Sequence, residues 1–267
     1  MCLIWFSYQK TPGYKLLLAA NRDEFFVRKT APLSWRDDLI AGWDEEGGGT
    51  WLAANRHGQI AALTNFRDPA RQRNNPPSRG EIIPNWLRSG RSAEVFLSEL
   101  RRRAERYNPF NLLLFDGERM FFYSNADDRI VPIAVGAHVL TNSFLDADWP
   151  KAKRISALMA GIGQAEQAEP RQHETRREVI GLRPSTQTPL KPEPFFAALA
   201  DRRQPQDTEL PRTGVGLDWE RMLAPVFITG AAYGTRSSAL VAVDADGRIE
   251  FYERAYRHKE KTAKSGA

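Results

Sequence analysis

The chain opens with the stretch CLIWFSY at residues 2–8, and this stretch decides the fold. Its residues 3–6 are apolar at every position, a pattern typical of a strand that is buried on both faces between two layers. A Thr-Pro-Gly turn at residues 11–13 leads to a second apolar run at residues 15–20, which ends at the polar tetrapeptide NRDE at residues 21–24. The two runs predict a β-hairpin whose second strand returns its end to the start of the first.

Short apolar segments separated by turn residues recur along the chain, and hairpin turns are frequent among them. Strand patterns fall at residues 39–42, 50–54, 59–65, 111–115, 120–124, 130–133, 137–141, 226–229, 236–243 and 249–252. Helical patterns fall at residues 81–88, 92–106, 148–159 and 195–199. Grouped strands with many hairpins predict an α+β fold in which antiparallel sheets are covered by helices.

The chain is interpreted as one domain at residues 1–256, followed by a charged tail at residues 257–267 that we expect to be disordered. Residues 163–190 are polar and poor in large hydrophobic side chains, which indicates a mobile loop or a solvent-facing helix. The glycine run at residues 47–49 lacks the lysine of a phosphate-binding loop and leads into a strand, so it predicts a tight turn or a bulge.

Composition and charge argue against several classes of protein. The 38 Lys and Arg exceed the 33 Asp and Glu by only five and are scattered, so we expect no nucleic-acid partner. No apolar run approaches the roughly 20 residues of a membrane span, so we expect no stable membrane insertion and a cytoplasmic location. One cysteine excludes an internal disulfide, and four widely spaced histidines show no metal-ligand spacing, so neither metal nor cofactor is expected.

Cys2 is the residue that most directly suggests chemistry. Its small side chain permits removal of Met1, which would leave a cysteine with a free α-amino group at the chain start. The thiol could then act as the nucleophile and the α-amine of the same residue as the base. An α-amine titrates near about 7.7–8.0 and a thiol near about 8.5, so this pair suits neutral pH. Considered alone, a cysteine at the head of a buried strand is more often a small core residue.

The opening hairpin is expected to bring the tetrapeptide beside Cys2. Arg22 could then stabilise a thiolate, and Asp23 could hold the ammonium group or orient the amine. Because alternation sends Asp23 and Glu24 to opposite faces of a strand, either acid remains a candidate, and we assign the role to Asp23. A solvated strand end with an internal salt bridge explains the same residues without catalysis.

Two Thr-Asn pairs and one arginine also stand at strand ends. Asn65 and Asn142 each end a predicted strand, where a side-chain amide can donate to an oxyanion, although asparagine is also common in turns. Arg236 leads into a buried strand, and a charge there needs a partner such as a substrate carboxylate, Asp23 or solvent.

Several motifs together resemble the NRDE family, which includes the transport and Golgi organisation protein 2 group. They are Met1-Cys2, NRDE at 21–24, GGGTWL at 47–52, LTNFR at 63–67, DTELP at 207–211, GVGL at 214–217 and YGTRSS at 233–238. The resemblance covers nearly the whole chain and implies an N-terminal-nucleophile (Ntn) hydrolase-like fold, a four-layer αββα sandwich.

A more distant similarity points to the bile salt hydrolase and penicillin V acylase group. In that group a processed cysteine is followed by an Arg/Asp pair, two asparagines of the oxyanion region and a late arginine. The similarity implies these roles for Cys2, Asn65, Asn142 and Arg236. Those acylases tend to carry Arg-Asn-x-Asp where this chain has Asn-Arg-Asp-Glu, so which acid faces the amine is open.

The leading hypothesis is a cysteine amidohydrolase that cleaves a linear C–N bond of a small molecule. The residues assigned to catalysis are Cys2, Arg22, Asp23, Asn142 and Arg236, and those assigned to substrate binding are Asn21 and Asn65. The alternative is a protein that binds or carries haem or an acyl lipid in the same cavity without turnover. No histidine has an obvious position for haem, which leaves Cys2 as its only attractive ligand. A purely structural module would leave the polar strand ends unexplained.

Overall fold

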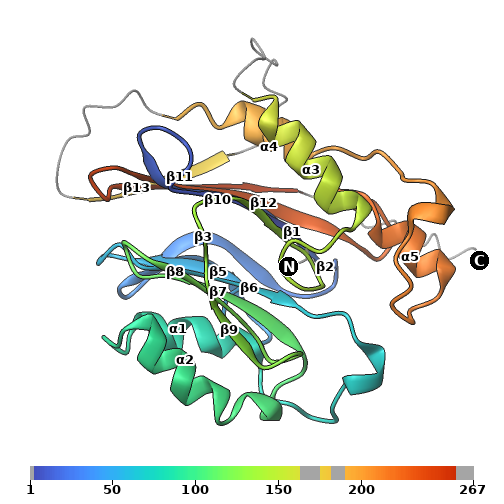
Figure 1. Cartoon of the computed structure of the whole chain (residues 1–267), viewed down its shortest axis with the longest axis horizontal. Coiled ribbons are helices and arrows are strands. Elements are labelled where there is room, and N and C mark those ends of the chain that lie inside the picture. The colour runs from blue at the N-terminus through green and yellow to red at the C-terminus, as the bar shows by residue number, and fades with distance from the viewer. Residues whose placement is uncertain (1–2, 163–174, 182–189, 257–267) are drawn as a thin grey trace, which may run out of the picture.

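The computed structural model of the protein describes residues 3–162, 175–181 and 190–256. Its strands form two antiparallel sheets that lie face to face (Figure 1). The strand order of the six-stranded sheet is β10 (Gly136–Leu140), β1 (Leu3–Tyr8), β2 (Tyr14–Phe25), β12 (Tyr233–Asp244), β13 (Ile249–Ala255), β11 (Thr175–Ile180). The strand order of the seven-stranded sheet is β3 (Thr30–Arg36), β4 (Leu39–Asp44), β5 (Leu52–Asn55), β6 (Ile60–Asn65), β7 (Phe110–Phe115), β8 (Met120–Ser124), β9 (Arg129–Pro132).

Helices cover the outer faces of both sheets. The seven-stranded sheet is covered by α1 (Ile82–Leu87) and α2 (Ala93–Arg101), and the six-stranded sheet by α3 (Pro150–Ala160) and α4 (Glu193–Leu199) (Figure 1). A fifth helix, α5 (Leu217–Leu223), lies beside one end of the six-stranded sheet. The predicted α+β fold, a four-layer αββα sandwich, is therefore confirmed.

The apolar opening stretch has neighbours on both of its faces. Ile4 and Phe6 belong to the core between the two sheets, whereas Leu3 and Trp5 pack under the outer helices. Ile4, Phe6 and Leu3 are fully buried, and burying one such side chain contributes about 1.5–3 kcal/mol. Side chains of a strand alternate between faces, so a strand in the middle of four layers requires apolar residues at every position.

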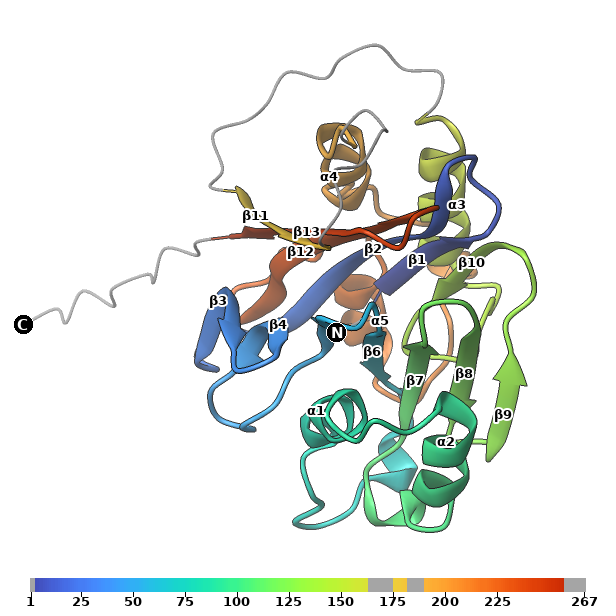
Figure 2. The ribbon, with the colours of Figure 1, turned by 90° about the vertical axis from the view of Figure 1, so that its left-hand side faces the viewer.

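The predicted hairpin is present, and β2 is longer than its apolar run. Leu3 lies opposite Asn21 and Tyr8 opposite Leu16 in the β1–β2 register. Strand β2 continues through the tetrapeptide to Phe25 because β12 pairs with it on the other side. Figure 2 shows the chain leaving β2 and turning directly into β3 of the other sheet.

Two predictions differ from the structure, and two elements had no predicted counterpart. The apolar segment 226–229 is no strand; only Thr229 forms an isolated bridge, with Gly234. Its residues 226–228 are nonetheless buried, because an apolar pattern reports burial and not strand pairing. Within the stretch 163–190, residues 175–180 form the edge strand β11, whose polar sequence suits an exposed edge. Strand β3, which contains a proline, and helix α5 lacked a recognisable pattern.

Residues 163–174, 182–189 and the expected tail 257–267 lie outside the described residues. Among the residues that are described, no helix has the length and apolar character that crossing a membrane requires.

Candidate functional site

The start of β1 and the end of β2 lie side by side, as the hairpin predicts. Leu3 is the first described residue and faces Asn21, the first residue of the tetrapeptide. Cys2, which directly precedes Leu3 in the sequence, lies outside the described residues, as does Met1. The groups around this end of β1 therefore define the candidate site, and the role assigned to Cys2 stays a prediction.

Side chains alternate along β2, so Asn21 and Asp23 lie on one face of the strand and Arg22 and Glu24 on the other. Asn21 is fully buried, and its Nδ2 donates to the carbonyl oxygens of Leu199 and Val226 at 2.9 and 2.8 Å. Its Oδ1 accepts a hydrogen bond of 2.5 Å from Ser238 Oγ. These bonds tie β2 to the end of α4 and to the neighbouring strand β12. The geometry of Asn21, predicted to bind substrate, is that of a structural side chain.

Asp23 shares its face of the strand with Asn21. Its Oδ1 accepts a hydrogen bond of 2.6 Å from Thr235 Oγ1, which itself accepts one of 2.9 Å from Ile228 N. Asp23 is 2% exposed, so its Oδ1 is held by the Thr235 hydroxyl group and not by solvent. A buried carboxylate oriented in this way can position a neighbouring cation, which is the role predicted for it.

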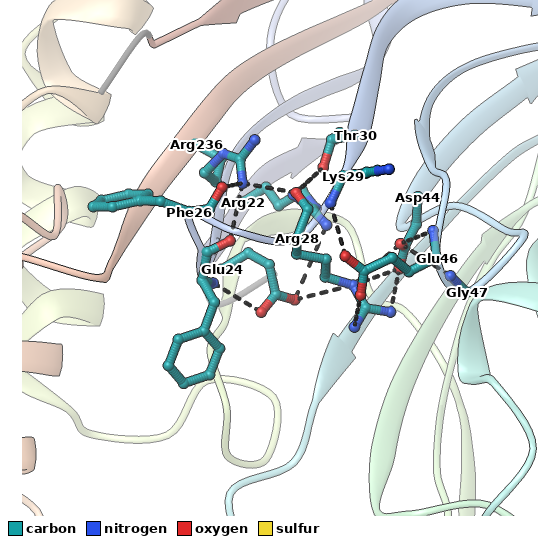
Figure 3. A network of polar contacts seen from close by, with 11 residues as sticks. Arg22, Glu24, Phe26, Arg28, Lys29, Thr30, Asp44, Glu46, Gly47 and Arg236 are labelled. Atoms are coloured by element: carbon teal, nitrogen blue, oxygen red, sulfur yellow. Dashed lines mark hydrogen bonds and ion pairs between the residues drawn. The ribbon is translucent and has the colours of Figure 1, made fainter. Parts of the chain in front are cut away.

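Arg22 projects to the opposite side, between the two sheets. Its guanidinium lies 4.2 Å from the ring centre of Trp51, donates from Nη1 to Thr30 Oγ1 at 3.0 Å, and reaches Glu24 at 4.0 Å (Figure 3). Burial lowers the pKa of Arg22, and the charges of Glu24 and Asp44 counteract this. Arg22 is thus a desolvated cation held in place by an aromatic face and a hydroxyl group.

The two Thr-Asn pairs, more than seventy residues apart in the sequence, meet where β6 and β10 end. Thr64 Oγ1 donates to the carbonyl of Thr141 at 2.9 Å, and Asn142 Nδ2 donates to the carbonyl of Asn65 at 2.8 Å. Arg67 N donates to the carbonyl of Asn142 at 2.7 Å. These bonds join one sheet to the other and fix the orientation of the Asn142 amide group.

Arg236 lies at a β-bulge of β12, where the register with β2 shifts between Thr235 and Ser237. Its Nη1 donates to three backbone carbonyl oxygens, those of Phe25, Phe26 and Arg28, each at 2.9 Å (Figure 3). Burial lowers the pKa of Arg236, and Glu24 counteracts this. The contacts hold the loop that follows β2, whereas binding of a ligand anion by Arg236 stays a prediction.

A network of charged side chains, which the sequence did not predict, continues from Arg22 and Glu24. Arg28 donates from Nε and Nη2 to the carboxylate of Asp44, with its Nη2 at 2.8 Å from Oδ2, and lies 3.8 Å from Glu24 and 3.7 Å from Glu46 (Figure 3). Burial acts to raise the pKa of Asp44, but the hydrogen bonds from Arg28 and Gly47 N outweigh it and hold the pKa below its usual range.

This network forms part of the wall of a cavity of about 320 Å³. Arg22 and Asn65 line it, so the cavity includes two of the predicted site residues. Arg28, Asp44 and Arg79 also line it, and no spacing in the sequence links these three to the tetrapeptide. Within the described part of the chain, no group of three or more His, Cys, Asp or Glu side chains is placed to hold a metal ion.

Among curated proteins, this chain is similar over nearly its full length to Transport and Golgi organization protein 2 homologs. It is 30% identical to the Bos taurus protein over 98% of this chain and 95% of that one. It is 29% identical to the Homo sapiens protein, over 97% and 95% of the two chains. The Drosophila melanogaster Transport and Golgi organization protein 2 is 26% identical, over 95% and 91%.

Among solved structures, the chain is similar to the Caenorhabditis elegans ortholog of N-acylethanolamine-hydrolyzing acid amidase, with a TM-score of 0.43, 10% identity and coverage of 90% and 92%. A mutant conjugated bile acid hydrolase from Clostridium perfringens has a TM-score of 0.36 and 12% identity, with 97% of each chain covered. Likeness at this level says nothing about the activity of this chain.

The motifs that resemble the family are spread along the chain, from the opening hairpin to the bulge of β12. The family profile described as Transport and Golgi organisation 2 matches residues 1–258, and the chain therefore belongs to the Transport and Golgi organisation 2 family.

Proposed function

We propose that this protein is a cysteine N-terminal-nucleophile hydrolase that cleaves a linear amide C–N bond of a small molecule. The observation that supports the proposal is the convergence at the start of β1. Leu3 faces Asn21, and the next two residues of β2, Arg22 and Asp23, are a buried cation and a buried carboxylate. The residue that precedes Leu3 is Cys2, the only cysteine of the chain.

The proposed reaction begins after Met1 has been removed. The Cys2 thiol loses its proton to its own α-amine, and the sulfur attacks the amide carbonyl carbon. The proton then passes to the leaving nitrogen as the C–N bond breaks, which releases an amine and leaves a thioester. Water attacks the thioester with the α-amine again as the base, releases the carboxylic acid and restores the thiol.

Five other side chains have supporting roles in the proposal. Arg22 favours the thiolate because a cation close to a thiol lowers its pKa. Asp23 holds the α-ammonium group, and the amide groups of Asn142 and Asn65 stabilise the oxyanion. Removing one donor of an oxyanion hole typically lowers kcat by about 10²–10³. Arg236 positions the loop after β2 through its three carbonyl contacts.

The proposal is tested with a panel of N-acyl amino acids and acyl amides, offered to the wild type and to Cys2→Ala in parallel. Amine release by the wild type and none by Cys2→Ala is expected. The intact mass of the purified protein reports whether Met1 is absent. Turnover by protein that retains Met1, or equal turnover by Cys2→Ala, would exclude the mechanism. Haem and acyl lipids are included in the panel, and tight binding of either without turnover would favour the non-catalytic alternative.

Alkylation of the thiol supplies a second readout that does not require the right substrate. The rate of reaction with iodoacetamide is measured against pH for the wild type and for Arg22→Gln. If Arg22 favours the thiolate, the wild type reacts below the ordinary thiol pKa of about 8.5, and the profile of the variant moves to higher pH. Identical profiles would contradict this role of Arg22.

A further inference from the structure

Arg79 is placed at the cavity by a close contact between two turns. A short 3₁₀ turn, Arg79–Glu81, packs against the glycine run, and Thr50 N donates to the carbonyl of Gly80 at 3.1 Å. A Cβ atom at Gly49 would lie 2.3 Å from the carbonyl carbon and oxygen of Gly80, so only glycine allows this approach. The glycine run therefore brings the segment that carries Arg79 to the wall of the cavity.

Arg79 differs from the other arginines of the cavity in its partners. Arg28 is paired with Asp44, Glu46 and Glu24, and Arg22 reaches Glu24 and stacks on a tryptophan. Arg79 donates from Nη1 to the carbonyl of Pro109 at 3.1 Å, and no carboxylate oxygen of the described residues lies within 4.0 Å of its guanidinium.

Partial burial nevertheless removes part of the water from the Arg79 side chain. Desolvation lowers the pKa of Arg79, and the charge of Glu24 counteracts this only from a distance. A cation that is partly desolvated and has no carboxylate partner loses hydration energy, and a bound anion would offset that cost. A guanidinium also presents a planar set of donors that matches a carboxylate.

We propose that this cavity binds the carboxylate group of a small-molecule ligand, with Arg79 as the principal cation and Arg22 as the second. Three arginines and two carboxylates, Glu24 and Asp44, line the cavity, which leaves one positive charge in excess. One excess charge matches a monoanion such as a carboxylate and disfavours a phosphate dianion. Asn65 lines the same cavity, so a ligand anchored there extends toward the junction with Asn142. The identification of this ligand as the substrate of the hydrolase rests on the proposed function, whereas the binding itself does not.

The test compares two probes that differ by one charge, N-hexanoylglycine and its neutral amide N-hexanoylglycinamide. Binding is measured by ligand-observed NMR titration to Cys2→Ala, which cannot turn the probes over by the proposed route. The acid is expected to bind about tenfold or more tightly than the amide, because a charge-assisted hydrogen bond contributes about 1.5–3 kcal/mol. Inorganic phosphate is the third probe and is expected to bind more weakly than the acid.

Two variants introduced into Cys2→Ala are expected to act in opposite directions. Arg79→Gln weakens binding of the acid by about tenfold or more and weakens binding of the neutral amide much less, because the amide lacks the charge-assisted hydrogen bond. Glu24→Gln removes a competing carboxylate and tightens binding of the acid by about two- to fivefold. Loss of folding cannot produce tighter binding, so Glu24→Gln remains informative even if Arg79→Gln folds poorly. Arg106→Gln, at an exposed arginine outside the cavity, is the matched control and leaves both affinities unchanged.

Equal affinity for acid and amide would overturn the proposal, as would an acid affinity that neither variant alters. Phosphate that binds more tightly than the acid would overturn the assignment to a monoanion. The outcome is separable from that of the proposed function. If the protein binds the acid but the wild type hydrolyses no amide, the carboxylate site stands and the proposed hydrolase function is excluded. If the wild type hydrolyses amides at rates that do not depend on a substrate carboxylate, the proposed function stands and the carboxylate site is excluded.

Discussion

Asn21 was predicted to bind substrate, and its contacts lead to a specific prediction for Asn21→Ala. The substitution removes the bonds to the carbonyls of Leu199 and Val226 and to the hydroxyl of Ser238, all at a position with 0% exposure. Each such bond contributes about 1 kcal/mol net, so the loss is about 3 kcal/mol. In a chain of this size about 2–4 °C of melting temperature corresponds to 1 kcal/mol, so Tm falls by about 6–12 °C.

The assay is thermal unfolding followed by circular dichroism, together with a double-mutant cycle. Ser238→Ala and the double variant with Asn21→Ala are compared with the single variants at one pH. Because the two side chains share a hydrogen bond, the double variant is expected to be less destabilised than the sum of the single variants, by about 0.5–3 kcal/mol.

The reasoning is refuted if Asn21→Ala melts within about 2 °C of the wild type. Additive effects of the two substitutions would show that the contact between the two side chains contributes nothing to stability. If Tm is unchanged while KM for a substrate rises, Asn21 has the binding role that the sequence suggested and not the structural one.

Three further predictions concern the surroundings of the cavity. Gly49→Ala places its Cβ 2.3 Å from a backbone carbonyl and is expected to lower the free energy of unfolding by about 1–3 kcal/mol, measured by thermal unfolding. Gly161→Ala is the control, because its Cβ meets no atom closer than 3.5 Å, and its Tm should stay near that of the wild type. Although burial acts to raise the pKa of Asp44, its bonds to Arg28 lower it, so this carboxylate stabilises the fold above its unfolded pKa of about 3.9 and the effect is lost as pH falls through the lower folded pKa. Asp44→Asn should reduce Tm at neutral pH and flatten the acid part of the Tm–pH curve; an unchanged curve would contradict the pairing. Burial raises the pKa of Glu253, so the stability of the fold should decline as pH rises from about 4.3 toward the folded pKa. Glu253→Gln should remove this decline. A Tm of the variant well below that of the wild type at pH 8 would contradict the prediction.

Predictions about the positions of site residues agreed with the structure where they depended on local strand geometry. The hairpin argument correctly placed Arg22 and Asp23 beside the start of β1, because the turn and the loop length fix the register of a hairpin. Alternation also predicted that Asp23 and Glu24 point to opposite faces, and their separate partners confirm it. The carbonyl partners of Arg236 could not be predicted, because they lie at the end of β2 and in the loop after it, whose path no pattern predicts.

Arg79 is a residue whose position at the cavity no local pattern predicts. It follows two prolines and a serine in a stretch without periodicity, so nothing in the sequence marks it as buried or functional. Its place at the cavity depends on contact with the glycine run about thirty residues earlier, and the glycines themselves predicted only a tight turn or a bulge. Contacts between two irregular segments carry no repeating pattern, and sequence reasoning therefore missed the cavity.

The sequence by itself determined the layering of this protein, its opening hairpin and its family. Apolar residues at every position of residues 3–6 require neighbours on both faces, and the spacing of hairpin turns requires antiparallel sheets. Only the tertiary structure decided which polar groups meet. Asn65 and Asn142 come together because two different sheets end at the same place, and Arg79 lacks the carboxylate that Arg28 has. Burial and periodicity are local properties of a strand, whereas the pairing of charges and amides depends on distances between segments that only the packed fold fixes.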